Sequence, residues 1–349
     1  MPKTTIDDVA ELAGVSIKTV SRVANREPNV RESTRITVEK AIAELEYRPN
    51  LSARNLASHR SHIIALVYDD PSAYEVPSEG YVVRLQQGAL RACRSAGYEL
   101  LIHPCNYRNR DVRGELKVLI EHSRPDGIIL AAPLSNMPKI VNAIAATGTP
   151  LVRMSTGNKN GKQYSVATND REISAEMTRY LASLGHTTIA FITGHKSHKA
   201  VTNRFFGYQD GLTQSGLKFS ERLVVAGDNS IGSGEDCASR LLGRNRRPTA
   251  IFAANDDMAA GIIRVADRLG LNVPGQLSVA GCDDSALAQQ IYPALTTIRQ
   301  PLAAMAERAT RALVDVSRHG SSKQGTEVVP ATLEIRESTG AAPHQGLPE

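Results

Sequence analysis

Beyond residue 62, short apolar runs alternate with amphipathic stretches, and this alternation restricts the chain to a few architectures. Short apolar runs are typical of strands that are buried on both faces. The runs cover residues 63–67, 99–103, 127–131, 151–154, 188–192, 223–225, 250–253 and 277–280. The stretches between them, such as 82–96, 173–184 and 258–269, have helical periodicity. We therefore expect an α/β core of parallel sheets covered by helices on both faces, and about eight strands fit two lobes better than one.

Polar residues follow several of these expected strands. Asp69 and Asp70 come after the first run, Ser135 after the third, and Asn255 and Asp283 after later runs. Because ligands of open α/β sheets bind beyond the carboxyl ends of the strands, these side chains predict a cleft between the lobes. Carboxylates and amides exchange hydrogen bonds with hydroxyl groups, so the expected ligand is a sugar or another polyol. An Asp or Asn after a strand also often caps the next helix, and the sequence leaves that alternative open.

Residues 1–48 have a different pattern, which predicts a compact helical unit. Thr5 and Asp8 have the spacing of a capping box at the start of a first helix, and Gly14 is placed to end that helix. Ser16 then offers an N-cap for a second helix after a very short turn. Two short helices joined by a tight turn that contains glycine are typical of a helix-turn-helix.

The second helix is expected from Ile17 to about Asn25, with Val20 and Val23 facing inward. A third helix, from Ser33 or Thr34 onward, braces the pair. Its expected core stripe consists of Ile36, Ala41, Ile42 and Leu45. In a helix-turn-helix the second helix enters the major groove of DNA. The alternative is that this unit is only a small helical cap on the core.

Residues 49–62 form the expected hinge helix and linker between the two parts. Asn50 is placed to cap one more short helix, which carries Ala53, Arg54 and Leu56. A small residue, an outward arginine and an exposed leucine suit the minor groove, where apolar side chains unstack a base step. Leu56 could instead pack beneath the next domain.

Two sets of motifs resemble those of a known family. In the head they are Thr5-Ile6-x-Asp8-Val9-Ala10, Ala13-Gly14-Val15-Ser16-x-x-Thr19-Val20-Ser21-Arg22-Val23, Leu45-x-Tyr47-x-Pro49-Asn50 and Ala53-Arg54-x-Leu56. In the core they include Arg204-x-x-Gly207-Tyr208, Ala254-Asn255-Asp256-x-Met258, Val279-x-Gly281-x-Asp283-Asp284 and Leu295-Thr296-Thr297-Ile298-Arg299-Gln300-Pro301. Over residues 4–338 the chain resembles the LacI/GalR family of bacterial transcription regulators. The resemblance implies a small all-α helix-turn-helix head plus hinge helix, followed by a two-lobed core similar to periplasmic binding proteins.

The expected contacts with DNA combine this resemblance with side-chain chemistry. They are Thr5, Ser16, Ile17, Lys18, Thr19, Ser21, Arg22, Asn25, Asn50, Ala53, Arg54 and Leu56. Lys18 and Arg22 suit guanine O6 and N7, and Ile17 suits a thymine methyl group. Thr19, Ser21 and Asn25 are better matched to phosphates, which fix register without reading sequence.

The resemblance also implies which residues contact a small-molecule effector. They are Asp69, Tyr74, Ser135, Arg204, Asn229, Asn255, Asp283 and Gln300. Arg204 fits this role, because a guanidinium binds paired hydroxyls or a carboxylate with two hydrogen bonds.

Three departures from the family pattern bear on the ligand. Asn229 stands where several relatives have an aromatic residue that stacks on the ligand, and the chain contains no Trp. Asn169-Asp170 inverts an acidic-then-amide pair that is common in the family, and Cys282 replaces a usual aromatic. A flat purine, which needs a stacking platform, is therefore less expected than a sugar or sugar acid, although Tyr74 or Phe205 could replace the missing aromatic.

Composition and missing motifs narrow the class of protein. No run of 18 or more apolar residues occurs, which argues against a membrane helix, and acidic residues near the start argue against a signal peptide. The four cysteines lie far apart, which argues against a disulfide framework or a zinc site and for a cytoplasmic protein. The net charge of +5 is too small to name a partner. We find no G-x-S-x-G, P-loop or H-E-x-x-H motif, so we expect neither an enzyme nor a bound cofactor or metal.

The sequence thus predicts a ligand-controlled repressor of carbohydrate-utilisation genes that a sugar-like effector releases from DNA. The alternatives are a purine- or nucleoside-responsive corepressor-type regulator and a stand-alone small-molecule-binding protein. We expect a homodimer on a pseudo-palindromic operator, because a single head offers few contacts. Residues 63–340 form the effector-binding and dimerisation core, with a late strand at 328–335, and residues 341–349 form a flexible tail. That tail has no leucine heptad of the kind that makes tetramers in some relatives.

Overall fold

A computed structural model describes residues 4–24, 29–47, 60–69, 79–107, 109–156, 163–196, 198–320 and 323–343. The chain divides into two compact units, residues 1–61 and 62–349. Six of the predicted site residues lie outside the described residues, as does most of the predicted hinge helix. They are Asn25, Asn50, Ala53, Arg54, Leu56 and Tyr74.

The first unit contains α1 (Ile6–Ala13), α2 (Ile17–Ala24) and α3 (Glu32–Glu44). Its core is formed by Val9, Ala10, Val20, Val23, Val38 and Ala41, so all three helices contribute to it. The predicted capping box is present: the amide of Asp8 donates to the Thr5 hydroxyl, and a carboxylate oxygen of Asp8 accepts from the Thr5 amide at 2.7 Å. Gly14 ends α1 in the left-handed conformation, as predicted.

The core stripe that we predicted for the third helix is wrong in one position. Ile36 is 47% exposed, and Val38, which we did not select, is completely buried. The helix begins at Glu32, before the predicted Ser33 or Thr34. Ile36 and Ala41 are five residues apart and point about 140° apart around the helix, whereas Val38 and Ala41, three residues apart, share the buried face.

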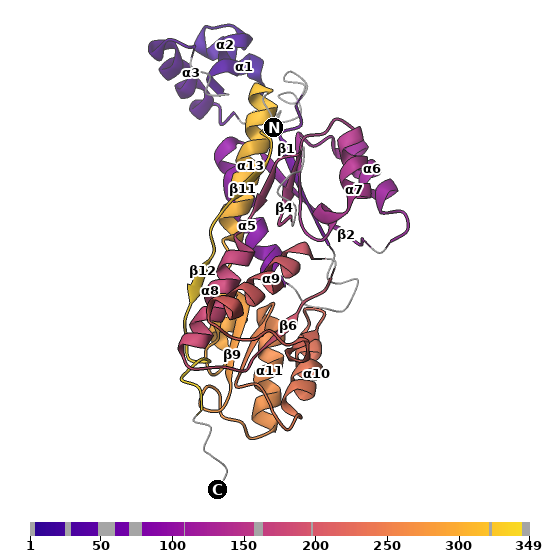
Figure 1. Ribbon diagram of the computed structural model, residues 1–349. Helices are drawn as coiled ribbons and strands as arrows, with labels where there is room; N and C mark the ends of the chain where they lie inside the picture. The colour runs from indigo at the N-terminus through magenta and orange to yellow at the C-terminus, as the bar shows by residue number, and fades with distance from the viewer. Residues whose placement is uncertain are drawn as a thin grey trace. The chain divides into compact units, whose positions relative to one another are not determined.

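The second unit contains two six-stranded sheets, one in each lobe (Figure 1). The strands of the first lobe are β1 (Ile63–Asp69), β2 (Glu99–Cys105), β3 (Gly127–Leu130), β4 (Leu151–Met154), β5 (Ser165–Ala167) and β11 (Thr326–Val328). In the second they are β6 (Ile189–Thr193), β7 (Val224–Ala226), β8 (Ala250–Ala253), β9 (Ser278–Asp283), β10 (Thr296–Arg299) and β12 (Thr332–Glu334). The strand orders are β11-β5-β4-β3-β1-β2 and β12-β10-β9-β8-β6-β7. Among the described strands, β12 alone pairs antiparallel, with β10.

Every predicted run forms a strand, but the sequence prediction is incomplete. The late strand expected at 328–335 is two strands in different sheets, because Pro330, which cannot donate to a ladder, separates β11 from β12. β5 and β10 were not predicted as strands. Both are short, and β10 contains two threonines and an arginine, so its apolar signal is weak.

Helices cover both faces of the sheets. The first lobe contains α5 (Glu79–Ala96), α6 (Val112–Ser123), η2 (Leu134–Asn136), α7 (Pro138–Ala146) and α13 (Leu302–His319). The second contains α8 (Asp170–Ser183), α9 (Lys199–Gln214), η3 (Glu221–Leu223), α10 (Ile231–Leu242), α11 (Asp256–Arg268) and α12 (Ala286–Gln290). None of the described helices is long and apolar enough to cross a membrane.

The strand β1 shows why its sequence is apolar throughout. Ile64 and Leu66 pack with residues of α5 and α13 on one face of the sheet, whereas Ala65 and Val67 pack with residues of α6 and α7 on the other. Successive side chains of a strand point to opposite faces, so a strand covered on both sides needs apolar residues at every position.

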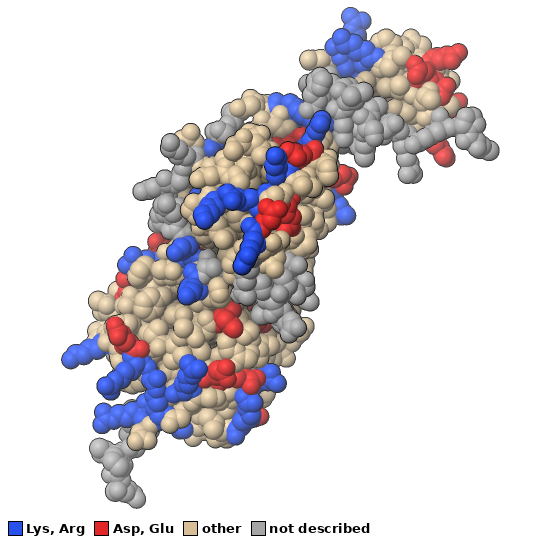
Figure 2. Space-filling view, turned by 90° about the vertical axis from the view of Figure 1, so that its right-hand side faces the viewer, with Lys and Arg blue, Asp and Glu red and all other residues tan. Residues whose placement is uncertain are grey.

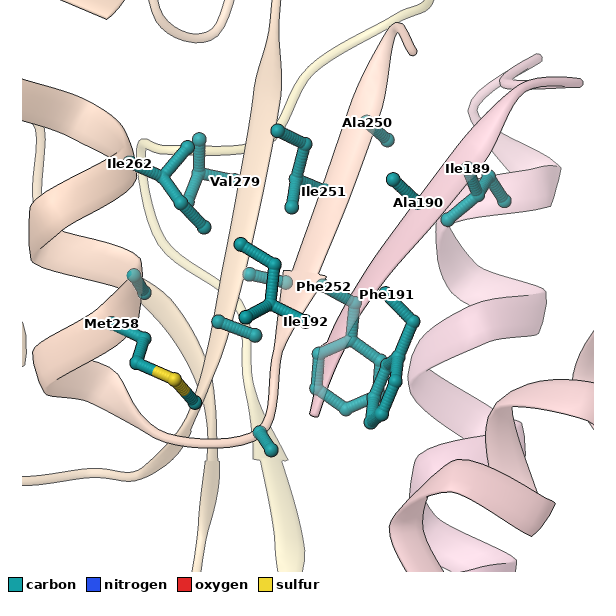
Figure 3. Packing of buried hydrophobic residues seen from close by; sticks show 14 of the residues in the cluster. Ile189, Ala190, Phe191, Ile192, Ala250, Ile251, Phe252, Met258, Ile262 and Val279 are labelled. Atoms are coloured by element: carbon teal, nitrogen blue, oxygen red, sulfur yellow. The ribbon is translucent and has the colours of Figure 1, made fainter. Parts of the chain in front are cut away.

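The second lobe repeats this arrangement (Figure 3). Phe191 of β6 stacks on Tyr208 of α9 with ring centroids 5.1 Å apart and meets Phe252 of β8 edge-on at 5.2 Å. On the other side, Met258 and Ile262 of α11 pack against the sheet. These contacts hold the strands whose carboxyl ends carry the polar residues described below.

Within the described residues the chain passes between the lobes at three lobe crossings. These are residues 168–169, between β5 and α8, residues 300–301, between β10 and α13, and residues 329–331, between β11 and β12. The first lobe is therefore completed by a helix and a strand that follow the second lobe in sequence. On the face shown in Figure 2, Lys and Arg side chains also gather over the lower part of the core, so basic residues are not confined to the head.

Candidate functional site

The helix α2 separates apolar from polar residues in the way that a DNA-reading helix requires. Val20 and Val23 are buried in the head, whereas Ile17 is 47% exposed and Lys18 and Arg22 are exposed. The three side chains that we expect to meet base edges therefore lie on the outer face of the helix. The arrangement is compatible with entry into a major groove.

Three of the predicted DNA-contacting hydroxyls, those of Thr5, Ser16 and Thr19, lie at helix N-termini. The Ser16 hydroxyl accepts a hydrogen bond from the Thr19 amide at 3.3 Å and contacts the Thr19 hydroxyl at 3.0 Å. Thr5 holds the equivalent position at α1 through its capping box. Helix N-termini carry partial positive charge and free amides, which favour phosphate groups nearby. Ser21 is half-buried in the middle of α2.

A cavity of about 480 Å³ in the second unit is lined by residues of both lobes. The sequence-predicted residues that line it are Asp69, Arg204, Asn229, Asn255, Asp283 and Gln300. Asp69 and Asp283 end β1 and β9, and Asn255 and Gln300 follow β8 and β10. The carboxyl ends of four parallel strands thus deliver polar side chains to one space, and its volume is typical of small-molecule sites.

Arg204 lies on α9 and is only 6% exposed. Its Nε donates to Asp170 at 2.9 Å and its Nη1 donates to the carbonyl of Ala254 at 2.6 Å. These contacts fix the guanidinium against the cavity wall, because each uses a different nitrogen. Among the described residues Nη2 has no hydrogen-bond partner, so it is the nitrogen left for a ligand.

Asp283 is a buried carboxyl beside other acidic groups. Burial raises the pKa of Asp283 to about 7; Arg204 opposes this rise and Asp256 adds to it. Gln300 donates a hydrogen bond to the Asp283 carboxylate. Burial and the neighbouring Asp256 also raise the pKa of Asp257 to about 6. The cavity therefore holds carboxyl groups that can donate as well as accept hydrogen bonds near neutral pH.

The asparagines have mixed roles. Asn255 caps α11, because its Oδ1 accepts from the Met258 amide at 3.1 Å, while its Nδ2 donates to the carbonyl of Asn229 at 2.9 Å. Asn229 has φ of 78°, which asparagine tolerates better than most residues, and its Oδ1 accepts from the His195 amide at 3.2 Å. The capping alternative left open by the sequence thus holds for Asn255, which also lines the cavity.

Ser135 is not brought to the cavity. It is completely buried in η2, and its hydroxyl donates to the carbonyl of Met154 at 2.7 Å, which ties η2 to β4. The prediction rested in part on the rule that ligands of open α/β sheets bind beyond the carboxyl ends of the strands. Here the polar residue satisfies a backbone acceptor inside the first lobe instead.

The lining residues that the sequence analysis did not select as site residues include several aromatic ones. They are Tyr68, Tyr81, Tyr107, His195 and His198. Tyr107 and His195 follow β2 and β6, so the strand-end rule could have found them, whereas Tyr81 belongs to the first turn of a helix. Burial lowers the pKa of His198 to about 4, so its ring is neutral at pH 7. The absence of Trp therefore does not leave the cavity without surfaces on which a flat ligand can stack.

Comparison with known proteins extends these observations to the whole chain. Residues 5–50 match the family described as "Bacterial regulatory proteins, lacI family", and residues 178–339 match the "Periplasmic binding protein-like domain". The transcriptional regulator GalR of Escherichia coli K12 is 33% identical over 96% of this chain and 95% of its own length. The ribose operon repressor of the same organism is 32% identical over 95% of this chain and 98% of its own length.

Solved structures are similar over the same extent. The lac repressor dimer bound to operator and the anti-inducer ONPF matches with a TM-score of 0.78 and 28% identity, covering 97% of this chain and 100% of that one. The complex of the regulator CelR with cellobiose matches with a TM-score of 0.73 and 28% identity, covering 96% of this chain and 100% of that one. The chain belongs to the LacI/GalR family of bacterial regulatory proteins.

Proposed function

We propose that this chain represses carbohydrate-utilisation genes and that a sugar-like effector, bound in the cavity between the two lobes, releases it from operator DNA. The observation that carries the proposal is that one chain combines a helix-turn-helix head with a cavity that both lobes wall and that charged and amide side chains line. The names of its relatives support a sugar, since they include a ribose operon repressor and a regulator in complex with cellobiose.

The cavity supports a ligand rich in hydroxyl groups. Arg204 Nη2 offers a donor, and Asp69, Asp257 and Asp283 offer carboxylate oxygens. Arg204 is already paired with Asp170, so it offers little positive charge to offset these carboxylates. A negatively charged ligand therefore gains little electrostatic attraction in the cavity. The lining therefore favours a neutral saccharide over the sugar acid that the sequence left equally open.

The DNA-reading half of the proposal follows the exposed face of α2. Lys18 and Arg22 read base edges, and Thr5, Ser16, Thr19, Ser21 and Asn25 hold phosphates. Residues 49–62 act as a hinge helix, with Leu56 as the minor-groove wedge and Asn50, Ala53 and Arg54 beside it. The protein acts as a homodimer on a pseudo-palindromic operator, and the similarity to a lac repressor dimer bound to operator supports the dimer.

A purine- or nucleoside-responsive regulator is the second candidate. The observation in its favour is the set of three tyrosines, Tyr68, Tyr81 and Tyr107, among the lining residues. Aromatic rings stack on bases, but they stack equally on the apolar faces of sugar rings. The three tyrosines are therefore compatible with a purine or nucleoside ligand but do not favour it over a saccharide.

The test is a ligand screen followed by a DNA-release assay. Thermal unfolding of the full chain is measured against panels of neutral saccharides, sugar acids and nucleosides, and operator fragments are selected from genomic DNA with the protein itself. We expect a neutral saccharide to raise the unfolding temperature and to weaken operator binding. A nucleoside that raises the unfolding temperature and tightens binding would favour the second candidate, and a ligand without effect on DNA binding would favour a stand-alone binding protein.

A matched pair of variants ties the result to the cavity. Arg204→Lys removes the Nη2 donor of a cavity-lining residue and should abolish the ligand-induced shift. Arg171 on α8 pairs with Asp210 on α9, with 2.5 Å between Nε and Oδ2, so this exposed pair joins the same two helices as the Arg204–Asp170 pair. Arg171→Lys alters that exposed pair and should leave the ligand-induced shift unchanged. Equal loss in both variants would mean that helix packing, not the cavity contact, controls binding.

A further inference from the structure

Two of the three lobe crossings are joined to each other by hydrogen bonds. The β5–β11 pairing ends at Ala167 and Val328, and the Val329 amide then donates to the Ala167 carbonyl at 2.9 Å. Beyond that point the chain segments leave the first sheet. The Ala331 amide donates at 2.8 Å to a side chain, the Oδ1 of Asn169. This side-chain contact therefore continues the ladder past the end of the first sheet and joins the crossing at 168–169 to the one at 329–331.

Asn169 makes this contact in place of the one expected at its position. It is the N-cap of α8, where an asparagine side chain ordinarily accepts from an amide of the first turn, yet its side chain makes no such hydrogen bond. Its Oδ1 accepts instead from the Ala331 amide and, at 3.2 Å, from the hydroxyl of Thr168. The oxygen thus joins two crossings at the expense of a local cap.

The next residue connects the same point to the cavity. Asp170 is 5% exposed and accepts from Arg204 Nε at 2.9 Å, and Arg204 lines the cavity. Asn169 and Asp170 are adjacent, so a displacement of Arg204 that pulls on Asp170 also moves the oxygen that holds Ala331. The order of the two residues matters: with the acid first, the carboxylate would stand at the crossing and the amide would face Arg204.

We propose that Asn169 is a positioning residue that couples the cavity to the lobe crossings, because its Oδ1 holds Ala331 while its neighbour Asp170 holds Arg204. The role of this coupling rests on the proposed function, because it would make the angle between the lobes depend on whether an effector occupies the cavity. The contacts themselves do not depend on which effector binds. A ligand that moves Arg204 changes that angle only as far as it binds the two arrangements with different affinity.

The first test removes the acceptor at Asn169 in the full chain. Asn169→Ala lacks the acceptor and Asn169→Asp keeps one, so the pair isolates the hydrogen bond. Hydrogen–deuterium exchange of the Ala331 amide, read by mass spectrometry with fragmentation, should become at least about fivefold faster in Asn169→Ala and stay near the wild-type rate in Asn169→Asp. Exchange in β8, which lies in the interior of the second sheet, should not change. Unchanged protection of Ala331 in Asn169→Ala would overturn the proposal.

The second test asks whether the cavity side reaches the crossing. Arg204→Lys disturbs the contact with Asp170 but touches neither Asn169 nor Ala331, and it should also speed exchange at Ala331. Arg171→Lys, which alters the exposed Arg171–Asp210 pair between the same helices, should not. No effect of Arg204→Lys, or an equal effect of both substitutions, would overturn the coupling.

A third readout separates positioning from mere stabilisation. Spin labels at Lys139→Cys on α7 and Arg240→Cys on α10 report the distance between the lobes, and the four native cysteines are buried. With labelled protein diluted into unlabelled protein, electron–electron double resonance should show a broader distance distribution in Asn169→Ala than in wild type or Asn169→Asp. An unchanged distribution would reduce Asn169 to a local contact. Neither effector nor DNA is needed, so this result is independent of the proposed function.

Discussion

Asp283 illustrates how much of the site depends on single residues. Its φ of 126° is unusual for a residue other than glycine, and its carboxyl is buried among Asp256, Asp257 and Arg204. A buried carboxylate costs free energy unless it is paired, and Arg204 already serves Asp170. The folded protein therefore favours the protonated form of Asp283, with its pKa raised to about 7.

This shift predicts how Asp283→Asn changes the pH dependence of stability. The ordinary pKa of an aspartic acid is about 3.9, so between pH 4 and 7 the folded chain binds more protons at this site than the unfolded chain. The contribution of Asp283 to stability is thus greatest below pH 4 and is lost as the pH rises to about 7. Asn keeps the acceptor for Gln300 but does not titrate, so the unfolding temperature of the variant should gain on wild type from pH 5 to 7 and by little more at pH 8. A difference that does not vary with pH would contradict the shifted pKa.

Arg22 carries a prediction about DNA. If its exposed guanidinium reads a guanine, Arg22→Ala should cost roughly 1–3 kcal/mol of binding and relax the preference at one base position. Binding measured on operators that vary one base at a time would show this. Equal losses on every operator would assign Arg22 to a phosphate instead.

At this scale the sequence predicted part of the cavity. Asp69, Asn255 and Asp283 follow from the rule that ligands bind at the carboxyl ends of strands, which depends only on chain order. Gln300 follows β10, a strand that was not predicted, so only the family resemblance pointed to it. Tyr81 could not be found that way, because it is brought to the cavity by the packing of α5. The Asn169–Ala331 contact joins residues far apart in the chain, and no local pattern marks it.

At the scale of elements, α5 and α13 pack closely against each other (Figure 1). A Cβ atom at Gly88 of α5 would lie 1.9 Å from the carbonyl oxygen of Ala303 on α13, so glycine is needed for the backbones to approach. At Gly232 on α10, by contrast, no atom lies within 4 Å of a built Cβ. The two glycines therefore serve as a matched pair.

Gly88→Ala and Gly232→Ala should have opposite effects. The first must push α13 away from α5, and overpacking of this kind costs about 1–3 kcal/mol, more than the ~0.5–1 kcal/mol that alanine gains over glycine in a helix. The second should be neutral or slightly stabilising. Thermal unfolding of both variants measures this, and a Gly88→Ala protein as stable as wild type would show that the helices adjust without cost.

Elements with strong local signals were predicted best. The box formed by Thr5 and Asp8, and the apolar runs of the parallel strands, depend on neighbouring residues alone. Residues 328–335 show the limit: an apolar run looks the same whether it stays in one sheet or changes sheets. Ile36 was assigned to the core of α3 because it is apolar, but its five-residue spacing from Ala41 places it away from the buried face.

For the whole molecule, the division into two units separates the two proposed activities. The head has its own core and the cavity lies wholly in residues 62–349. Contacts with an effector are therefore confined to the second unit, and any influence on DNA must pass between the units.

We expect an effector to stabilise the second unit alone when DNA is absent. At a hundred times its dissociation constant, it should add about 2.7 kcal/mol to the unfolding free energy of the part that binds it. Hydrogen exchange should slow in β8 and β9 and stay unchanged in α1 and α3. Slower exchange in the head without DNA would mean that the units are coupled before the operator is bound.

The three lobe crossings also determine the order in which the lobes can fold during synthesis on the ribosome. Synthesis yields β1 to β5 first, but the sheet of that lobe still lacks β11, and its face lacks α13, until the chain has been extended well past residue 300. The second lobe in turn waits for β12, which emerges last of all the strands described. Neither lobe can finish folding while the chain is still short, and a truncated product that stops before these strands leaves two incomplete sheets with open edges for quality control to remove.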